Sequence, residues 1–581
     1  MARIRELEIL NFRGIKTLVW QPAPGLNCLI GTGDSGKSTI LDAIDLCLGA
    51  RRNIQFSDTD FYGLEIANPI SITLTLGDLS ESLKTIDGYG IFLRSFNAIN
   101  GLVDDEPENG SEVVISLNLT VASDLEPSWT LFSVRAKQQG IVKSLAWKDR
   151  LNLAPTRIGT ASDFNLAWQR GSVLNRISEE RADASIALVQ AAREARNAFG
   201  DSAEMQLSQA LGIVQETAKE LGVYIGERAK AMLDSHSASF GAGTIALHNE
   251  AGIPLRGLGI GSTRLLIAGL QRRASQSSTI VLADELEYGL EPHRIIRFLG
   301  SLGAKEAQPP LQAFLTTHSP VALRELSGAQ LFVVRGAPQG HTVQQVGLDN
   351  HMQSAIRKYP EAFFARSVIV CEGASEIGFL RGLDLYRASI GLASLAALGV
   401  SLIDSGGGTP DQAYSRGNVF LQFGYRVMVV RDADILPSPA VEQTFLANGG
   451  RYTAWGDGFA LEDELFNSLP SSSCLDLVGY AVELHDSIVN SNIQSASDGA
   501  LSIQTLNEEI TSTGSISTAT RHHLGRASRT KKNGWFKSIS WMEEVARNHV
   551  APALYSPLYE VDATFAAKVA SIFDWATDAE G

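Results

Sequence analysis

The chain has 581 residues, of which 44% are apolar and 19% are charged, with 53 glycines and 19 prolines. At about 100–200 residues per domain this length predicts three to five domains, and the composition excludes a disordered or fibrous chain. The 49 basic and 64 acidic side chains give a formal net charge of −15, which argues against a surface that is basic all over but is compatible with a local basic groove.

The first 150 residues are predicted to be mainly strands. Leu7 to Phe12 and Leu26 to Ile30 are short β-like runs. The segment from Ile70 to Leu76 alternates apolar and polar residues, which is typical of a half-buried strand.

A phosphate loop is predicted at residues 31–38, because the sequence GTGDSGKS satisfies G-x-x-x-x-G-K-[ST] between the strand Leu26–Ile30 and a predicted helix, Thr39–Leu48. In such a loop glycines let backbone N–H groups surround phosphate oxygens, Lys37 reaches the outer phosphates and the Ser38 hydroxyl contacts Mg²⁺. The motif therefore predicts ATP as a cofactor, bound with Mg²⁺. The residues predicted to bind it are Gly31, Gly33, Asp34, Ser35, Gly36, Lys37, Ser38 and Thr39.

A helical hairpin is predicted from about Leu174 to Leu221. Apolar residues recur there at helical spacing, Gly200 ends one helix, and Asp201 with Glu204 is typical of the capping pair that starts the next. The apolar seam packs either on its own domain or against another copy of the chain.

The second half of the nucleotide site is predicted where two further strands end. Thr279 to Ala283 is followed by Asp284, expected in the metal shell, and by Glu285, the candidate general base. The strand from Gln312 to Thr317 ends at His318, which we expect to contact the γ-phosphate.

These motifs, in this order, resemble the ATP-binding-cassette heads of the SMC/RecF type. The resemblance rests on residues 9–14 (ILNFRG), the phosphate loop, a long insertion, a signature at residues 257–264 (GLGIGSTR), the Asp-Glu pair and the histidine. It implies that Gly261 and Ser262 contact the nucleotide of a second head. The segment lacks the Ser that precedes the glycine pair in the common L-S-G-G form, which affects the expected strength of that contact.

A second αβ unit starts near Ala365. Its predicted strands, Ser367 to Cys371, Val400 to Ile403 and Arg426 to Val430, are separated by helix-length segments, which is the alternation of a parallel sheet.

Two acidic clusters follow strands of this sheet. Glu372 and Glu376 follow the first strand, and Asp432 and Asp434 follow the third. Because the carboxyl ends of parallel strands meet at one edge, these carboxylates are expected to converge and to repel one another unless a cation lies between them. Hard oxygen donors predict Mg²⁺ or Mn²⁺ rather than zinc.

With residues 405–408 (SGGG), the acidic clusters resemble a Toprim domain, the metal-dependent phosphodiester module of topoisomerases, primases and some nucleases. The resemblance implies that Glu372 is catalytic and that all four carboxylates bind metal. Glu462 and Glu464 either complete a second metal position, which would give a two-metal site, or belong to an exposed helix start.

Residues 511–541 form a basic segment without Asp or Glu. It is either a solvated loop or a phosphate-contacting surface. Lys537 is the candidate for neutralising charge on the scissile phosphate, with Lys531 and Lys532 as rivals. The six basic residues are Arg521, Arg526, Arg529, Lys531, Lys532 and Lys537.

An ATPase head with a helical insertion, followed in the same chain by a Toprim domain, resembles the OLD (overcoming lysogenisation defect) family of ATPase-nucleases. Residues 316–320 (TTHSP) and 371–376 (CEGASE) match its hallmarks, and residues 287–294 (EYGLEPHR) are similar to the subgroup encoded beside a UvrD-type helicase, which includes the nuclease subunit of the Gabija anti-phage system. The resemblance implies metal-dependent cleavage or nicking of DNA, homodimerisation or higher assembly through the insertion, a possible UvrD-type helicase partner, and a setting in phage defence or DNA repair.

The predicted fold class is therefore α/β. We expect an ABC-type head from residues 1–170 and 231–350, a dimerisation insertion at 171–230, and a Toprim domain with a parallel sheet and a C-terminal mixed region at 360–581. The leading hypothesis is an ATP-regulated, Mg²⁺- or Mn²⁺-dependent DNA endonuclease. The alternative is a RecF-like DNA-binding repair ATPase in which the Toprim fold is a clamp that does not cleave.

The cellular setting is predicted to be the cytoplasm. The four cysteines have no CxxC spacing, which argues against a disulfide framework or a zinc site. The sequence from Met1 to Arg5 leads directly into strand-like residues, and no apolar run approaches about 18 residues, so neither a signal peptide nor a membrane span is expected.

Overall fold

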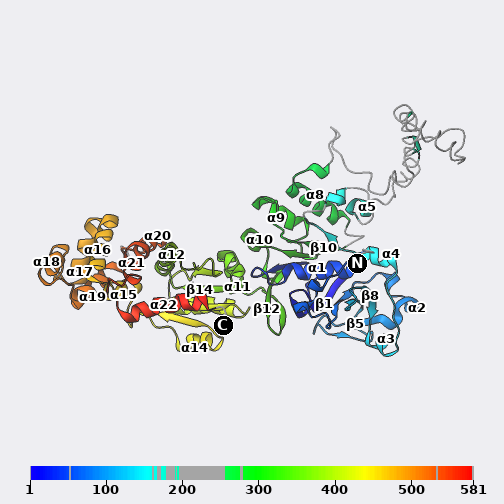
Figure 1. Cartoon of the computed structure of the whole chain (residues 1–581), viewed down its shortest axis with the longest axis horizontal. Coiled ribbons are helices and arrows are strands. Elements are labelled where there is room, and N and C mark those ends of the chain that lie inside the picture. The colour runs from blue at the N-terminus through cyan, green and yellow to red at the C-terminus, as the bar shows by residue number, and fades with distance from the viewer. Residues whose placement is uncertain are drawn as a thin grey trace, which may run out of the picture. The chain divides into compact units, whose positions relative to one another are not determined.

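The computed structural model describes residues 2–50, 54–159, 163–166, 172–177, 190, 193–194, 208, 255–274, 279–530 and 534–578 (Figure 1). These form two compact units. The first comprises Met1–Leu29, Gly36–Ala322 and Pro338–His341, and the second comprises Ile30–Ser35, Leu323–Ala337 and Thr342–Gly581. Most of the predicted insertion at 171–230 lies outside the described residues, and the division into an interrupted head and a Toprim domain stays a prediction.

An antiparallel sheet occupies the N-terminal part of the first unit. Its strand order is β2-β1-β4-β7-β5-β6, with β8 paired to β7. The strands predicted at Leu7–Phe12 and Ile70–Leu76 are confirmed as parts of β1 and β4. The strand bounds are β1 Arg3–Phe12, β2 Ile15–Trp20, β4 Ile70–Gly77, β5 Leu93–Phe96, β6 Val103–Asp104, β7 Glu112–Val121 and β8 Pro127–Phe132.

Strand β4 is buried on both faces, so the prediction of a half-buried strand is wrong. Thr75 is 1% exposed and its hydroxyl lies 2.9 Å from that of Ser116 on β7. The Asn118 amide, also on β7, donates to the Thr73 hydroxyl at 2.8 Å. The polar face of β4 is buried because the neighbouring strand supplies hydrogen-bonding partners for it.

A parallel run of strands in the order β3-β11-β10-β9 forms the core of the first unit. Strands β3, β10 and β11 are buried along their whole length, because each is a short, mostly apolar segment with no solvent-facing side. All three were predicted from the sequence and are confirmed within one residue. The bounds are β3 Leu26–Ile30, β9 Thr156–Arg157, β10 Ile280–Ala283 and β11 Gln312–Thr316.

Helix α1 (Lys37–Leu48) follows β3, as predicted, and buries one apolar face that includes Ile40, Leu41 and Ile44. The other described helices up to residue 325 are α2 Ile86–Tyr89, α3 Val134–Gln138, α4 Trp147–Leu153, α5 Val173–Ile177, α8 Ile260–Arg273, α9 Pro292–Ser301 and α10 Pro320–Glu325. Only the start of α10 belongs to the first unit. Two strands follow α10, β12 Leu331–Ala337 and β13 Gly340–Gln345.

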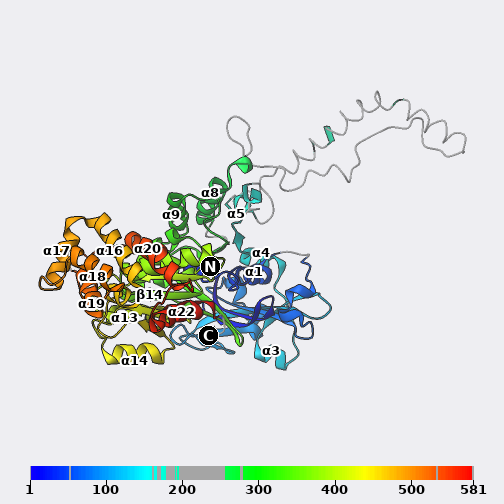
Figure 2. The ribbon, with the colours of Figure 1, turned by 60° about the vertical axis from the view of Figure 1, so that its left-hand side comes forward.

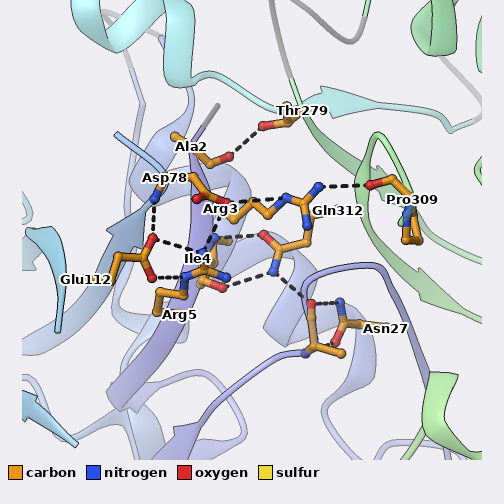
Figure 3. A network of polar contacts seen from close by, with 11 residues as sticks. Ala2, Arg3, Ile4, Arg5, Asn27, Asp78, Glu112, Thr279, Pro309 and Gln312 are labelled. Atoms are coloured by element: carbon orange, nitrogen blue, oxygen red, sulfur yellow. Dashed lines mark hydrogen bonds and ion pairs between the residues drawn. The ribbon is translucent and has the colours of Figure 1, made fainter. Parts of the chain in front are cut away.

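A polar network joins the start of β1 to the parallel strands (Figure 3). The Gln312 side chain is fully buried on β11, accepts from the Ile4 N–H at 2.8 Å, and donates to the carbonyls of Ile4 at 3.0 Å and Ala23 at 2.9 Å. Arg5 donates two hydrogen bonds to Glu112, at 2.8 and 2.9 Å. Residues more than 300 positions apart in the sequence therefore belong to one hydrogen-bond network.

Replacing Gln312 by Ala is expected to destabilise the first unit by about 2–4 kcal/mol, because the N–H and the carbonyl of the buried residue Ile4 both lose a hydrogen-bond partner. The Ala23 carbonyl keeps a hydrogen bond from the Asn27 amide at 2.9 Å. The measurement is the midpoint of urea or thermal unfolding. The matched control is Gln21→Ala, because Gln21 lies in the same unit, is exposed, and donates to the Glu6 carboxylate at 3.2 Å. Equal losses in the two variants would contradict the assignment of Gln312 as a buried tie.

A four-stranded parallel sheet organises the second unit. Its order is β15-β14-β16-β17, and every neighbouring pair is parallel. The three strands predicted for this sheet are confirmed. Its strands and the helices around it are α11 Asn350–Lys358, β14 Ser367–Cys371, α12 Ala374–Ser389, β15 Val400–Asp404, α13 Pro410–Leu421, β16 Arg426–Arg431, α14 Pro439–Ala447 and β17 Arg451–Ala454.

A group of helices follows the sheet and shares its hydrophobic core (Figure 2). Helix α12 lies against α20 at very short range, because a Cβ atom at Gly378 would come within 2.4 Å of the Ile539 carbonyl and one at Gly382 within 2.3 Å of the Glu543 carbonyl. The helices are α15 Leu461–Ser468, α16 Ser471–His485, α17 Ser487–Ala496, α18 Ile503–Thr513, α19 Thr518–Ser528, α20 Ile539–Val545, α21 Ala551–Leu554 and α22 Ala563–Thr577.

Helices of a length and apolarity sufficient to cross a membrane do not occur among the described residues. The four cysteines, Cys28, Cys47, Cys371 and Cys474, are buried and free.

Candidate functional sites

The predicted phosphate loop turns through left-handed backbone conformations. The φ angles are 138° at Gly31, 59° at Asp34 and 87° at Gly36. At Gly36, a Cβ atom would in addition lie 3.3 Å from the ring of His341. Helix α1 begins directly afterwards at Lys37, so the loop has the backbone form that presents successive N–H groups to an anion at a helix N-terminus.

Ser38 and Asp284, predicted to share the metal shell of a nucleotide, lie in contact. The Ser38 hydroxyl donates to Asp284 Oδ1 at 3.0 Å, and the Thr316 hydroxyl donates to the same oxygen. These side chains come from the starts or ends of α1, β10 and β11, so the parallel strands bring the two halves of the predicted site together.

Glu285, the predicted general base, follows Asp284 in an unusual backbone conformation. Its φ is 44°, which is uncommon for a residue other than glycine, and its side chain is exposed. The Glu285 N–H donates to the Thr316 hydroxyl at 2.8 Å, which holds the turn in place. An exposed carboxylate on a fixed turn is available to a water molecule or a nucleotide.

Arg264 clamps the segment that follows β10, a role that the sequence reasoning did not assign. Its guanidinium is buried and donates to the carbonyls of Asp284 at 3.0 Å, Glu285 at 3.0 Å and Tyr288 at 2.7 Å. Burial lowers the pKa of Arg264, and the nearby carboxylates, Glu287 first, oppose that shift. The sequence signal was its position as the last residue of the proposed signature.

Gly261 and Ser262 are engaged within the first unit. A Cβ atom at Gly261 would lie 2.0 Å from the Gly289 carbonyl, so only glycine fits at this start of α8. The Ser262 hydroxyl accepts from Arg294 Nη1 at 3.1 Å. Their contact with the nucleotide of a second head stays a prediction.

Glu287 connects the end of β10 to the end of β11. Its carboxylate accepts from the Thr317 hydroxyl at 2.6 Å and from the His318 N–H at 2.8 Å. His318 itself is exposed. The position of His318, the predicted γ-phosphate contact, therefore depends on Glu287, which lies two residues after the predicted base Glu285. In the sequence, Glu287 stood out only as the first residue of the family pattern at 287–294.

Replacing Glu287 by Gln is expected to lower kcat for ATP hydrolysis about tenfold and to leave KM within about twofold, because an amide cannot accept both hydrogen bonds and the His318 segment loses its position. Steady-state phosphate release measures both constants. Glu291→Gln is the matched control, since Glu291 is an exposed carboxylate at the start of α9 that pairs with Arg294, three residues further on. A kcat for Glu287→Gln equal to that of the control would refute this role.

The second unit contains a cavity of about 810 Å³ at the carboxyl ends of its sheet strands. Strands β14 and β16 are neighbours and parallel, so the clusters that follow them meet at one edge, as predicted. Five carboxylates of the predicted metal-binding set line the cavity: Glu372, Glu376, Asp432, Asp434 and Glu462.

Backbone N–H groups hold three of these carboxylates. Glu372 accepts from the Asp432 N–H at 3.1 Å, Glu376 from the Gly373 N–H at 2.9 Å, and Asp432 from the Leu461 N–H at 2.9 Å. The carboxylates are therefore fixed by the turns that follow the strands rather than placed freely in solvent.

The environment of the cavity disfavours negative charge on its carboxylates. Burial raises the pKa of Glu372 to about 7, and Asp434 adds to the shift. Burial followed by neighbouring carboxylates, chiefly Glu462 for Glu376 and Glu376 for Asp432, raises the pKa of both residues well above the usual range. Such a cluster favours a cation that would offset its charge.

The donor set fits a hard divalent cation in chemistry, since it consists of carboxylate oxygens. In the part of the chain that the structure describes, however, no group of three or more His, Cys, Asp or Glu side chains is placed so that it could hold a metal ion. The two-metal site stays a prediction.

The acidic residues at the start of α15 divide between two places. Glu462 lines the cavity and accepts from the Ser375 hydroxyl at 3.3 Å. Glu464 is not among the lining residues and instead accepts from the Gly456 N–H at 2.6 Å, with Lys568 Nζ 3.9 Å away. Both are buried, so the alternative of an exposed helix start is wrong.

Basic groups lie on the same cavity as the carboxylates. Arg529 pairs with Asp434 at 3.2 Å and with the buried Asp463 at 3.0 Å. Lys537 lines the cavity and donates to the Arg529 carbonyl at 3.2 Å. The rivals Lys531 and Lys532 lie outside the described residues. The described part of the segment 511–541 contains the end of α18, all of α19 and the start of α20, so a simple solvated loop is the wrong interpretation for that part.

A glycine turn after β15 contacts the backbone of Glu372, the candidate catalytic residue. Gly406, Gly407 and Gly408 have φ angles of 86°, 69° and 105°, a run that only glycine adopts readily. The Gly407 N–H and the Ser405 hydroxyl both donate to the Glu372 carbonyl, at 3.0 and 2.7 Å. The turn fixes the backbone of Glu372 at the cavity.

The chain matches the model of a known protein family. The family described as "AAA domain, putative AbiEii toxin, Type IV TA system" matches residues 26–324, which is more than half of the chain. This range begins at β3 and includes the phosphate loop, Asp284, Glu285 and His318.

Among curated proteins, the DNA replication and repair protein RecF of Moorella thermoacetica (strain ATCC 39073 / JCM 9320) is 38% identical over 55 residues, or 10% of this chain. The chain matches 15% of the length of that relative.

Three solved structures are also similar. An Smc head bound to the C-winged helix domain of ScpA has a TM-score of 0.35 at 15% identity and covers 60% of this chain and 99% of that chain. The Smc head of Pyrococcus furiosus with an extended coiled coil, bound to the C-terminal domain of ScpA, has a TM-score of 0.31 at 14% identity, covering 59% and 96%. The SMC head domain from Thermotoga maritima has a TM-score of 0.29 at 13% identity, covering 60% and 100%.

Proposed function

The chain belongs to the family described as "AAA domain, putative AbiEii toxin, Type IV TA system", an ATPase family, and from this premise we propose that it is an ATP-regulated, divalent-metal-dependent DNA endonuclease. The observation that carries the nuclease part is the cavity of the second unit, where five carboxylates of the predicted metal-binding set line one space with the basic side chains Arg529 and Lys537.

The ATPase part uses the residues at the ends of α1, β10 and β11. Lys37 binds the outer phosphates of ATP, and Ser38 with Asp284 supplies the oxygens that hold Mg²⁺. Glu285 orients and deprotonates the attacking water. His318, placed by Glu287, contacts the γ-phosphate.

The nuclease part uses the cavity. Glu372, Glu376, Asp432 and Asp434 are the residues that would hold Mg²⁺ or Mn²⁺, with Glu462 beside them. The metal would supply a Lewis acid for the phosphodiester and a nucleophilic water. Lys537 neutralises charge that develops on the scissile phosphate, and its bond to the Arg529 carbonyl keeps it at the cavity.

We also propose a domain type for the second unit and a family for the chain. The second unit is a Toprim domain, and the chain is an OLD-family nuclease of the helicase-associated class that includes the Gabija nuclease subunit. It acts on DNA in phage defence or DNA repair, as a homodimer or higher oligomer joined through the insertion, and a UvrD-type helicase is its candidate partner. The similarity to RecF, named a DNA replication and repair protein, supports DNA as the partner.

A second candidate is a RecF-like repair ATPase whose second unit clamps DNA without cutting it. Two observations favour it: the local similarity to RecF, and the absence, among the described side chains, of a three-ligand metal arrangement. It differs from the leading proposal in one outcome, because it predicts DNA-stimulated ATP hydrolysis without nicking under any divalent metal.

The deciding experiment is a nicking assay on supercoiled plasmid with Mg²⁺ or Mn²⁺, with and without ATP. The endonuclease is supported if the wild type converts the supercoiled plasmid to its nicked or linear form and a substitution of Asp432 abolishes this conversion. ATP hydrolysis that DNA stimulates, without any change in plasmid form, supports the clamp.

A further inference from the structure

The basic residues of the segment 511–541 have different structural roles. Arg521 at the start of α19 donates to the Phe466 carbonyl at 2.8 Å and to the Leu469 carbonyl at 2.6 Å, so it fastens α19 to α15. Arg529 is held by two carboxylates. These contacts fix the positions of both guanidinium groups.

Arg526 is different, because its guanidinium has no hydrogen bond or ion pair with any residue that the structure describes, although it lines a cavity with six carboxylates, the five above and Asp404. The side chain is exposed, on the same helix as Arg521. A guanidinium carries five N–H donors and binds planar oxyanions in pairs of hydrogen bonds. An unpaired one at the wall of a cavity is ready to bind an anion.

Neutral polar groups from the neighbouring helix stand beside Arg526 on this wall. Helices α17 and α19 pack side by side (Figure 1). Asn492 and Ser495 of α17 both line the cavity, and their spacing of three places them on one face of the helix. Helices α17 and α19 therefore add hydrogen-bond donors to a cavity whose carboxylates lie at the ends of the sheet strands and at the starts of α12 and α15.

We propose that Arg526, with Asn492 and Ser495, forms a contact site for a DNA backbone phosphate next to the bond that is cut. The inference rests on the proposed function and deepens it by assigning a substrate-binding wall to the C-terminal helices. A phosphodiester fits because guanidinium, amide and hydroxyl groups are the side chains that bind DNA phosphates, and the carboxylate wall repels a phosphate that is not held from the other side.

The same wall predicts that the contact is independent of sequence. The described residues that line the cavity include no aromatic side chain, and their apolar members are alanines and glycines. Bases therefore find no stacking surface there, and contacts to phosphate carry no sequence information by themselves. The site positions the backbone rather than selecting a base.

The test is DNA binding by Arg526→Ala, with Arg526→Lys as the conservative variant and Arg547→Ala as the matched control. Arg547 is an exposed arginine of the same helical region that does not line the cavity. Fluorescence anisotropy with two fluorescein-labelled duplexes of unrelated sequence, in Ca²⁺ and over a range of salt concentrations, gives Kd and its salt dependence.

We expect Arg526→Ala to weaken binding of both duplexes about tenfold and to reduce the slope of log Kd against log salt by about 0.9, the loss of one phosphate contact. Arg526→Lys should keep the slope and lose part of the affinity, because charge remains while the paired donors are gone. Arg547→Ala should match the wild type, and thermal midpoints should be unchanged in all three variants.

The two proposals fail in different ways. If Arg526→Ala and Arg547→Ala have the same Kd and salt slope while the wild type cuts plasmid, the Arg526 site is refuted and the endonuclease stands. If binding depends on Arg526 but no metal supports cutting, the endonuclease is refuted and the phosphate site stands. A wild type that binds no DNA refutes both.

Discussion

Asp432→Asn is expected to reduce metal-dependent cleavage of plasmid DNA on the order of 10²- to 10³-fold and to leave ATP hydrolysis unchanged. Asp432 lies at the end of β16, and its carboxylate shares the cavity with Glu372, Glu376 and Glu462, which all raise its pKa in addition to burial. The amide keeps an oxygen for the Leu461 N–H but removes the charge that would hold a cation. The measurement is the rate of nicking at saturating metal.

The fold should tolerate this change, because it removes one member of a set of mutually repelling carboxylates. The thermal midpoint of Asp432→Asn without metal should be equal to or higher than that of the wild type. Added Mg²⁺ should raise the midpoint of the wild type more than that of the variant.

Glu464→Gln is the matched control for Asp432→Asn. Glu464 is buried on the same unit, but it binds the Gly456 N–H and lies near Lys568 rather than at the cavity. We expect cleavage within about twofold of the wild type, because surroundings away from the reacting groups contribute little to the rate. Cleavage that survives in Asp432→Asn and disappears in Glu464→Gln would overturn the assignment of the cavity.

Lys37→Ala is expected to lower ATP hydrolysis by about 100-fold or more, because the charge that stabilises the outer phosphates is lost from the N-terminus of α1. Lys37 is 6% exposed and is the first residue of that helix. Phosphate release measures the rate. Lys16→Ala on β2 is the control, since Lys16 is an exposed lysine of the same unit.

The same variant tests whether ATP regulates cutting. If ATP changes the nicking rate of the wild type, Lys37→Ala should nick at one rate with and without ATP, because the variant no longer hydrolyses the nucleotide. A variant that hydrolyses ATP at the wild-type rate would refute the phosphate loop as the ATP site. A response of nicking to ATP that persists in the variant would place the regulation elsewhere.

The parts of the fold that the sequence predicts well are those with a local signal. Strands β3, β10 and β14 are short apolar segments followed by glycine or acidic residues, and β11 is a similar segment followed by Thr317 and His318. The structure buries all four completely. The phosphate loop has a fixed backbone path, so its residues and spacing indicate the turn and the helix directly. Parallel strands bring their carboxyl ends to one edge, which made the meeting of Glu372 and Asp432 predictable.

Contacts between distant segments were not predictable in the same way. Thr73 and Thr75 are buried because β7 supplies Asn118 and Ser116 opposite them, and nothing within β4 indicates those partners. The alternation of apolar and polar residues therefore gave a wrong expectation for the exposure of one face.

The sequence also could not predict the role of a side chain where that role depends on the direction in which the side chain points. Glu462 and Glu464 are two residues apart on α15, so they point to different sides of the helix, and only Glu462 reaches the cavity. Arg264 looked like part of a nucleotide signature, but both of its Nη atoms donate to carbonyls of its own unit. Basic composition likewise did not distinguish Arg521, which fastens a helix, from Arg526.

The pairing of β3 with β11 has a consequence for synthesis on the ribosome. Leu26–Ile30 hydrogen-bonds to Gln312–Thr316, so roughly 280 residues must be translated before the strand next to the phosphate loop gains this neighbour. At about 5–20 residues per second this interval is on the order of 15–55 s, during which an apolar strand is without its partner. A nascent chain that ends before Gln312 should therefore be a target of chaperones and proteases, and the first unit should become protease-resistant only after β11 has left the ribosome.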